Sequence, residues 1–150
     1  DETRRLLLLQ NAAFVAMFRE AMSERGKIKK LSIADLSLGD GKPSDIAVEK
    51  IFAELRGAPM TAARNLLAYL QQPSADAETA KGLMDTARML VFLKGDDAHD
   101  YKFSSAILED FYHVSPEWRN QYLAANSFML PSSADRDNQL VARTRSALGV

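Results

Sequence analysis

The densest group of side chains able to do chemistry lies between residues 96 and 102. The run Asp-Asp-Ala-His-Asp-Tyr-Lys places a candidate base, a phenol and a cation within a few residues of one another. We take this run as the candidate catalytic or ligand-binding site. Its members are Asp97, His99, Asp100, Tyr101 and Lys102.

Helix capping is the competing explanation for the same run. Asp96, Asp97 and Asp100 stand where a helix is expected to begin, and carboxylates there accept hydrogen bonds from backbone N–H groups and interact favourably with the helix dipole. Capping does not explain why His99, Tyr101 and Lys102 share the same turn. Two hypotheses therefore remain, a polar site and an ordinary helix start.

The doublet His99-Asp100 resembles the His-Asp doublet of the HD-type metal-dependent phosphohydrolases, which are also all-α. The resemblance implies a metal-bound hydrolytic site, but it covers only these two residues. The family pattern needs another histidine upstream, whereas the only other histidine, His113, lies downstream.

A second candidate for metal binding is the pair Glu109 and His113. On a helix this i, i+4 pair would offer two ligands from one face, which is fewer than a metal site needs. His99 lies 14 residues from His113, or about 21 Å along a continuous helix, so the two histidines would not share one metal. We expect His113 to interact with a helix C-terminus instead, and we expect no cofactor.

Two further segments do not match the phosphate-binding or calcium-binding loops that they partly resemble. The turn at residues 39–44 lacks the phosphate-loop spacing, because Leu36 stands where a glycine is needed and Pro43 follows the lysine. A calcium loop starting at Asp35 has Asp40 where glycine is required and Ile46 in place of the bidentate glutamate. The sequence also contains no cysteine, which excludes disulfides and thiolate chemistry.

The composition describes a soluble globular chain of ordinary size. It has 150 residues, 47% hydrophobic and 26% charged, with a formal net charge of -1, so binding of nucleic acid is not expected. The most apolar segment, Leu6–Phe18, has 13 residues and falls short of the roughly 20 that span a bilayer. We expect it to be a deeply buried helix. The compartment stays open, with the cytoplasm as the default.

Helical periodicity predicts an all-α fold, a single domain over residues 1–150 with a connector around residues 27–42. We expect an irregular bundle of about six to seven helices. Breaks at Pro73-Ser74 and Ser115-Pro116 lie 42 residues apart, which leaves a short solenoid of two-helix repeats as the alternative. The predicted helices cover about 2–25, 45–56, 61–72, 75–94, 97–114, 116–129 and 133–148.

Apolar spacing also predicts which side chains face the core. The clearest sets are Ala63, Leu66, Leu67 and Leu70 in the third helix, and Ala80, Leu83, Met84, Ala87, Leu90 and Val91 in the fourth. Less regular sets follow in the last three helices: Phe103, Ala106, Ile107, Phe111 and Val114; Trp118, Tyr122, Ala125 and Met129; and Leu140, Val141, Thr144 and Leu148.

By elimination the sequence favours a non-catalytic interaction or scaffold domain that binds a protein partner or itself. The alternative is a small enzyme or ligand-binding protein with a site around His99-Asp100-Tyr101-Lys102. The two differ in whether those side chains converge on a concave pocket. A third hypothesis, that the chain is a segment of a longer protein, follows from its start at Asp1 rather than Met.

Overall fold

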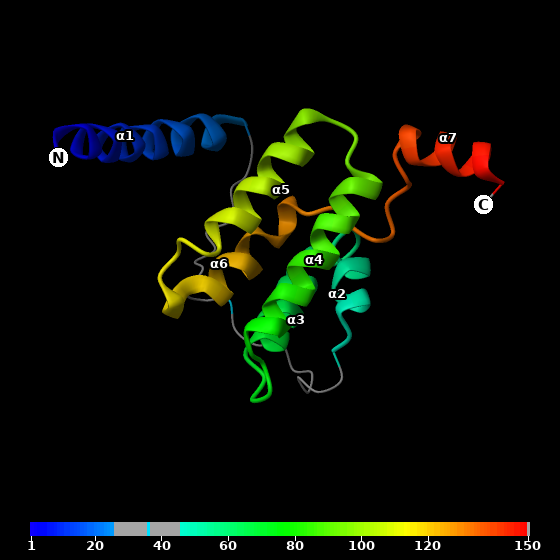
Figure 1. Ribbon diagram of the computed structural model, residues 1–150. Helices are drawn as coiled ribbons and strands as arrows, with labels where there is room; N and C mark the ends of the chain where they lie inside the picture. The colour runs from blue at the N-terminus through cyan, green and yellow to red at the C-terminus, as the bar shows by residue number, and fades with distance from the viewer. Residues whose placement is uncertain (26–35, 37–45, 150) are drawn as a thin grey trace. The chain divides into compact units, whose positions relative to one another are not determined.

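The structure is a computed structural model, which describes residues 1–25, 36 and 46–149. Within these residues it contains seven α-helices, two short 3₁₀ helices and no strand, which confirms the predicted all-α class (Figure 1). The elements are α1 (Glu2–Arg25), α2 (Val48–Glu54), α3 (Pro59–Leu70), α4 (Ala77–Lys94), α5 (Ala98–Asp110), η3 (Pro116–Trp118), α6 (Arg119–Asn126), η4 (Ser127–Met129) and α7 (Gln139–Leu148).

The chain divides into two compact units, residues 1–32 and 33–150. The prediction of one domain over 1–150 stays a prediction. Most of the predicted connector at 27–42 lies outside the described residues, as do the turn at 39–44 and the start of the rejected calcium loop. Of the connector, Leu36 is described, and it packs partly buried against the core of the second unit.

The first unit contains one regular element, the 24-residue helix α1. Glu2 in its first turn and Arg25 in its last turn both match the helix dipole. Every residue of α1 is exposed, so the expectation of a deeply buried helix is not confirmed. The physical reason is that a lone helix has no second layer of its own against which to bury apolar side chains.

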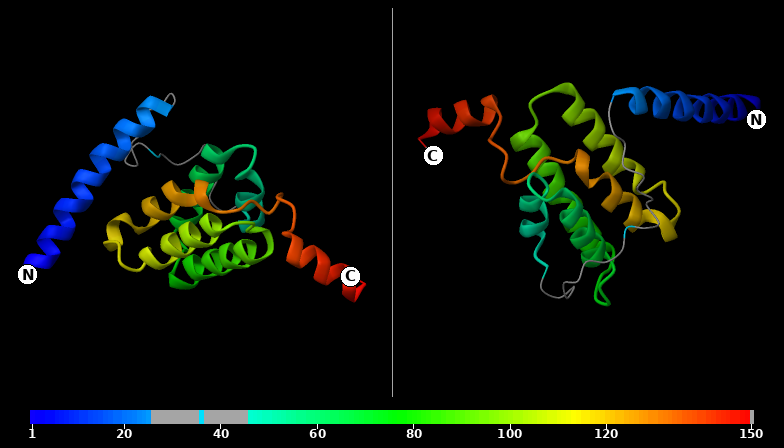
Figure 2. Two further views of the ribbon diagram at one scale, coloured as in Figure 1. Left: turned by 90° about the horizontal axis from the view of Figure 1, so that it is seen from above. Right: turned by 180° about the vertical axis from the view of Figure 1, so that it is seen from behind.

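The core of the second unit is built around α3, which packs on α2, α6 and η4. Views from above and behind show these helices gathered with α4 and α5 into an irregular bundle (Figure 2). Leu66 is completely buried, and the predicted inward set of this helix is confirmed in full. The spacing i, i+3, i+4 and i+7 is what one face of a helix requires; the set is Ala63, Leu66, Leu67 and Leu70.

The helix α4 begins at Ala77, two residues after the predicted start at residue 75. Asp76 is the N-cap: its carboxylate accepts the Thr79 N–H at 2.9 Å, while the Thr79 hydroxyl accepts the Asp76 N–H at 3.1 Å. This reciprocal capping box satisfies two backbone donors at once and so fixes the start of the helix. The predicted stripe is confirmed for its four central members, Leu83, Met84, Ala87 and Leu90, which are buried.

The buried face of α5 agrees only in part with the predicted one. Ser104, Ile107, Leu108 and the cap residue Phe111 are buried, whereas Phe103 is 47% exposed. The prediction is confirmed for Ile107 and Phe111 and wrong for Phe103, because a buried serine at position 104 interrupts the apolar pattern. The Ser104 hydroxyl has no hydrogen-bond partner within the described part of the chain. The helix also ends at Asp110, four residues before the predicted Val114.

The last two predicted stripes are largely wrong. Pro116–Trp118 forms the 3₁₀ helix η3, whose three residues per turn shift the phase of the face before α6 begins. Leu123 and Ala124 are buried as a result, and Trp118 is half exposed. The helix α7 starts after Asn138, six residues later than the predicted start at residue 133, and none of its residues is buried. Gly149 caps the end of this helix in the left-handed conformation.

Candidate functional site

The carboxylates of the 96–102 run form a helix cap. Asp97 is the N-cap of α5 and accepts hydrogen bonds from the N–H groups of His99 at 2.6 Å and Asp100 at 3.2 Å. Asp100 reciprocates by accepting the N–H groups of Asp96 and Asp97. The backbone hydrogen bond from His99, followed by that from Asp100, holds the pKa of Asp97 below its ordinary value. The capping explanation therefore accounts for Asp97 and Asp100.

Tyr101 also has a local structural role. Its hydroxyl donates to the Gly95 carbonyl at 2.8 Å, across the junction between α4 and α5. A Cβ at position 95 would stand 2.7 Å from the Val91 carbonyl oxygen and 3.3 Å from the Tyr101 ring, so the close approach requires glycine. Tyr101 and Gly95 thus fix the angle at which one helix follows the other.

The remaining two members, His99 and Lys102, are exposed. The His99 ring stacks on Phe103 with centroids 6.1 Å apart, and its Nδ1 lies 3.5 Å from an Asp97 carboxylate oxygen. The His99 side chain is 76% exposed, so water surrounds it. A side chain so open to solvent does not exclude water from a reacting atom.

The structure divides the predicted cluster between two surface hollows. His99 and Asp100 line one of about 560 Å³, together with Arg56 and Lys94. Tyr101 lines its neighbour of about 640 Å³, next to α7. Asp97 and Lys102 line neither of these two. The five side chains are neighbours along the chain and do not converge on one cavity.

The predicted metal-binding pair Glu109 and His113 does not lie on a single helix. Because α5 ends at Asp110, His113 lies in the following turn, where its N–H donates to the Asp110 carbonyl, and the pair with Glu109 does not share one helix face. Both side chains are exposed. Among the described residues, no three His, Cys, Asp or Glu side chains gather where they could hold a metal ion.

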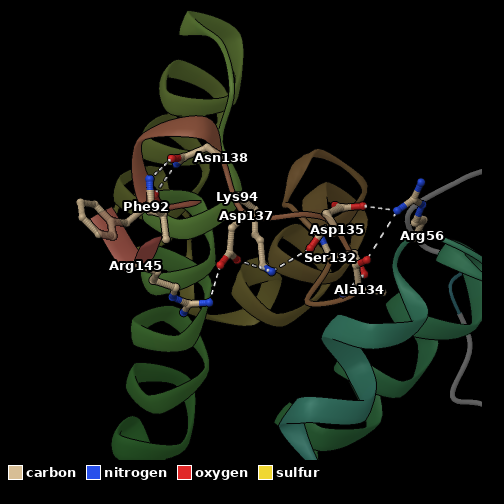
Figure 3. A network of polar contacts seen from close by, with 10 residues as sticks. Arg56, Phe92, Lys94, Ser132, Ala134, Asp135, Asp137, Asn138 and Arg145 are labelled. Atoms are coloured by element: carbon tan, nitrogen blue, oxygen red, sulfur yellow. Dashed lines mark hydrogen bonds and ion pairs between the residues drawn. The ribbon is translucent and has the colours of Figure 1, made fainter. Parts of the chain in front are cut away.

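A polar network that the sequence analysis missed lies beside these hollows, in the segment 131–138 (Figure 3). This segment supplies donors to carbonyls at the C-terminal ends of two helices. The Ser132 hydroxyl donates to Phe52 O of α2 at 2.7 Å, and the Asn138 amide donates to Phe92 O of α4 at 2.8 Å. Carbonyls in a last helical turn have no partner within their own helix, so the segment completes two helix ends.

Charged side chains reinforce the same segment. Lys94 donates to the Asp135 carbonyl at 2.7 Å and pairs with the Asp137 carboxylate at 2.8 Å, with both side chains less than one-fifth exposed. Arg145 of α7 pairs with the other Asp137 oxygen, and Arg56 lies 3.3 Å from an Asp135 oxygen. The cations near the hollow of about 560 Å³ are thus largely engaged by carboxylates, which favours a structural role.

The pairing of Asp137 makes stability depend on pH. The hydrogen bond from Lys94, aided by the charge of Arg145, holds the pKa of Asp137 below its ordinary value. Its contribution is therefore present above the unfolded carboxyl pKa of about 4 and is lost as pH falls through the lower folded pKa. We expect Asp137→Asn to be less stable than wild type at pH 7, with the difference shrinking towards pH 2, measured by urea unfolding and circular dichroism.

The matched control for this titration is Glu117→Gln, which neutralises an exposed carboxylate in η3. Its difference from wild type should stay small across the whole pH range. A constant difference between wild type and Asp137→Asn from pH 7 to pH 2 would contradict the role given to the Lys94–Asp137 pair.

No family model, curated protein or solved structure matches the chain. The similarity to HD-type phosphohydrolases stays limited to the doublet His99-Asp100. In the part of the chain that the structure describes, no helix combines the length and the apolar character needed to cross a membrane. The geometry of the two units is therefore the remaining guide to function.

Proposed function

We propose that the chain is a non-catalytic helical interaction domain, which binds a protein partner or a second copy of itself through α1. The observation that carries this proposal is the exposure of the whole apolar segment Leu6–Phe18 within a helix of 24 residues. Only Gln10 and Asn11 interrupt that segment with polar side chains. Contiguous exposed apolar surface of this kind marks sites of association.

The hydrophobic effect favours association of this apolar segment with another surface. Each large apolar side chain contributes on the order of 1.5–3 kcal/mol when it is removed from water. In α1 the large side chains Leu7, Phe14 and Phe18 are each more than half exposed. An isolated helix is only marginally stable in water, so packing against another surface would also stabilise α1 itself.

The charges of α1 favour a protein surface over a lipid surface. Helices that lie in a membrane interface carry a polar face rich in lysine and arginine, which attracts anionic lipids. The helix α1 instead carries four arginines and three glutamates, placed at both ends of the apolar segment. Such a balanced pattern suits pairing with another protein that presents charges of both signs.

The polar cluster at the junction of α4 and α5 gives less support to the catalytic alternative. Asp97 and Asp100 accept backbone hydrogen bonds, and the Tyr101 hydroxyl is engaged by Gly95. These side chains have structural roles that account for their presence. The interaction hypothesis needs no further assumption about them.

Photo-crosslinking in the cells that make the protein tests the proposal. With benzoylphenylalanine in place of Phe18, we expect an adduct larger than the 16.6 kDa chain on a denaturing gel, its second component identified by mass spectrometry. The adduct should form again from purified components. The same label in place of Leu148, which is exposed in α7, is the matched control and should give little adduct.

A second change links the adduct to apolar contact. Adding Leu7→Glu to the Phe18-labelled chain should weaken association by at least about tenfold, because a charge would enter the apolar contact. If the label at Phe18 joined only residues of its own polypeptide, α1 would not be an interaction segment and the proposal would be wrong.

A further inference from the structure

We infer that the second unit binds a small neutral molecule, an aromatic alcohol or phenol, in a hollow between α4 and α5 that has Ser104 at its floor. The hollow has a volume of about 320 Å³, and the two helices that line it contact one another (Figure 1). Sites for small molecules usually measure about 300–1,000 Å³, so this hollow suits a ligand of few atoms. The inference is independent of the function proposed for α1.

The side chain of Ser104 is the observation that points to a ligand. Four polar side chains are buried among the described residues, and three of them, those of Ser127, Ser132 and Asn138, donate hydrogen bonds to backbone carbonyls. The hydroxyl of Ser104, a residue that is 1% exposed, has no partner within that part of the chain. Native structures leave few buried polar groups unpaired, so this hydroxyl needs an explanation.

A partner within the same helix is the usual solution for a hydroxyl of this kind. Serine and threonine side chains in helices often donate to the carbonyl four residues earlier. Thr86 and Thr144 do so, at 3.0 Å and 2.8 Å. For Ser104 the corresponding carbonyl belongs to Asp100, yet the described residues include no partner for its hydroxyl. An unpaired buried hydroxyl lowers stability, and a ligand that pairs with it would remove this penalty.

The surroundings of Ser104 select the chemical class of the ligand. Val91 and Leu108 line the hollow with aliphatic side chains, and the ring of Phe92, which is 64% exposed, can stack on an aromatic ligand. The ligand group that pairs with Ser104 must be neutral, because burying an unpaired charge is costly. A hydroxyl is suitable, since it both donates and accepts, and the serine hydroxyl can turn about one single bond to meet it.

The two charged residues of the hollow do not favour a charged ligand. Arg88 pairs with Asp85 at 2.7 Å, and its side chain is 48% exposed. Glu109 is exposed as well. Both charges therefore lie at the opening, where water and salt screen them, and not at the floor beside Ser104.

Two probes of nearly equal shape test the site, para-cresol and toluene, which differ by one hydroxyl. Each is titrated into the full isotope-labelled chain while the backbone amide resonances are followed by NMR. We expect para-cresol to cause saturable shifts centred on Ser104, Ser105 and Leu108, with a Kd on the order of 1 mM. Toluene should bind about fivefold more weakly, because it lacks the group that pairs with the serine hydroxyl.

Substitutions of two neighbouring serines test which hydroxyl is responsible. Ser104→Ala should abolish the preference for para-cresol without weakening the binding of toluene. Ser105→Ala is the matched control, since it changes an exposed serine that lines the same hollow, and it should keep the preference. Ser105→Trp should abolish the binding of both probes, because an indole ring at that position would occupy the hollow.

Urea unfolding without any probe shows whether the Ser104 hydroxyl is unpaired. Ser104→Ala removes the hydroxyl and introduces a better helix former, so the urea midpoint should stay equal or rise. A lower midpoint would mean that the folded chain or an ordered water already satisfies the hydroxyl, and would overturn the inference. Equal affinity of the wild-type chain for the two probes, or shifts centred away from the hollow, would overturn it as well.

Discussion

Replacing Leu66 with alanine should lower the free energy of unfolding of the second unit by about 3 kcal/mol. Leu66 is completely buried on α3, the helix that packs on α2, α6 and η4. Its truncation removes apolar contacts and leaves a cavity that rigid neighbours fill only in part. Urea unfolding followed by far-ultraviolet circular dichroism measures the change. The loss is a large share of the roughly 5–15 kcal/mol that stabilises a typical domain.

Leu140→Ala is the matched control for this substitution. It makes the same chemical change in α7 at a side chain that is 69% exposed, and we expect an effect within about 0.5 kcal/mol. A small effect at Leu66 would mean that α3 is not the centre of the core. Equal losses at both positions would mean that the burial of the two leucines does not differ as described.

The buried face of a helix was predicted correctly where all of its inward positions carry apolar residues. In α3 and α4 the inward positions are occupied by alanine, leucine and methionine, so periodicity alone located the buried face. In α5 the inward position 104 is a serine, and the predicted stripe included the exposed Phe103 in its place. A period of 3.6 also fails where the chain changes to a 3₁₀ turn, which explains the wrong role given to Trp118.

In the candidate site, contacts between residues close in the sequence were predicted and contacts between distant residues were not. Asp97 was predicted as a cap from its position before a helix, because capping depends on residues only two or three positions away. The network around Ser132 was not predicted. Its hydroxyl reaches a carbonyl 80 residues away in the chain, and no local pattern contains that information.

The helix α1 shows what periodicity leaves open. Apolar residues on most sides of a helix indicate that it needs cover, and this led to the expectation of a buried position. The pattern does not say which surface provides the cover.

Ser132→Ala should lower the free energy of unfolding by about 1–2 kcal/mol, because it removes hydrogen bonds that each contribute about 1 kcal/mol net. The Ser132 hydroxyl is buried, donates to Phe52 O at 2.7 Å and accepts the Ala134 N–H at 3.1 Å. Its removal weakens both the C-terminal end of α2 and the turn that follows Pro131. The change is measured by urea unfolding, as for Leu66.

Ser133→Ala is the control, because Ser133 is exposed and contributes to the same helix end through its backbone N–H, which alanine retains. We expect that substitution to change stability by less than about 0.5 kcal/mol. If Ser132→Ala were equally mild, the hydrogen bonds from the segment 131–138 would not hold α2 in place. A clear loss at Ser132 alone would show that a loop hydroxyl, rather than an additional apolar contact, completes this end of the bundle.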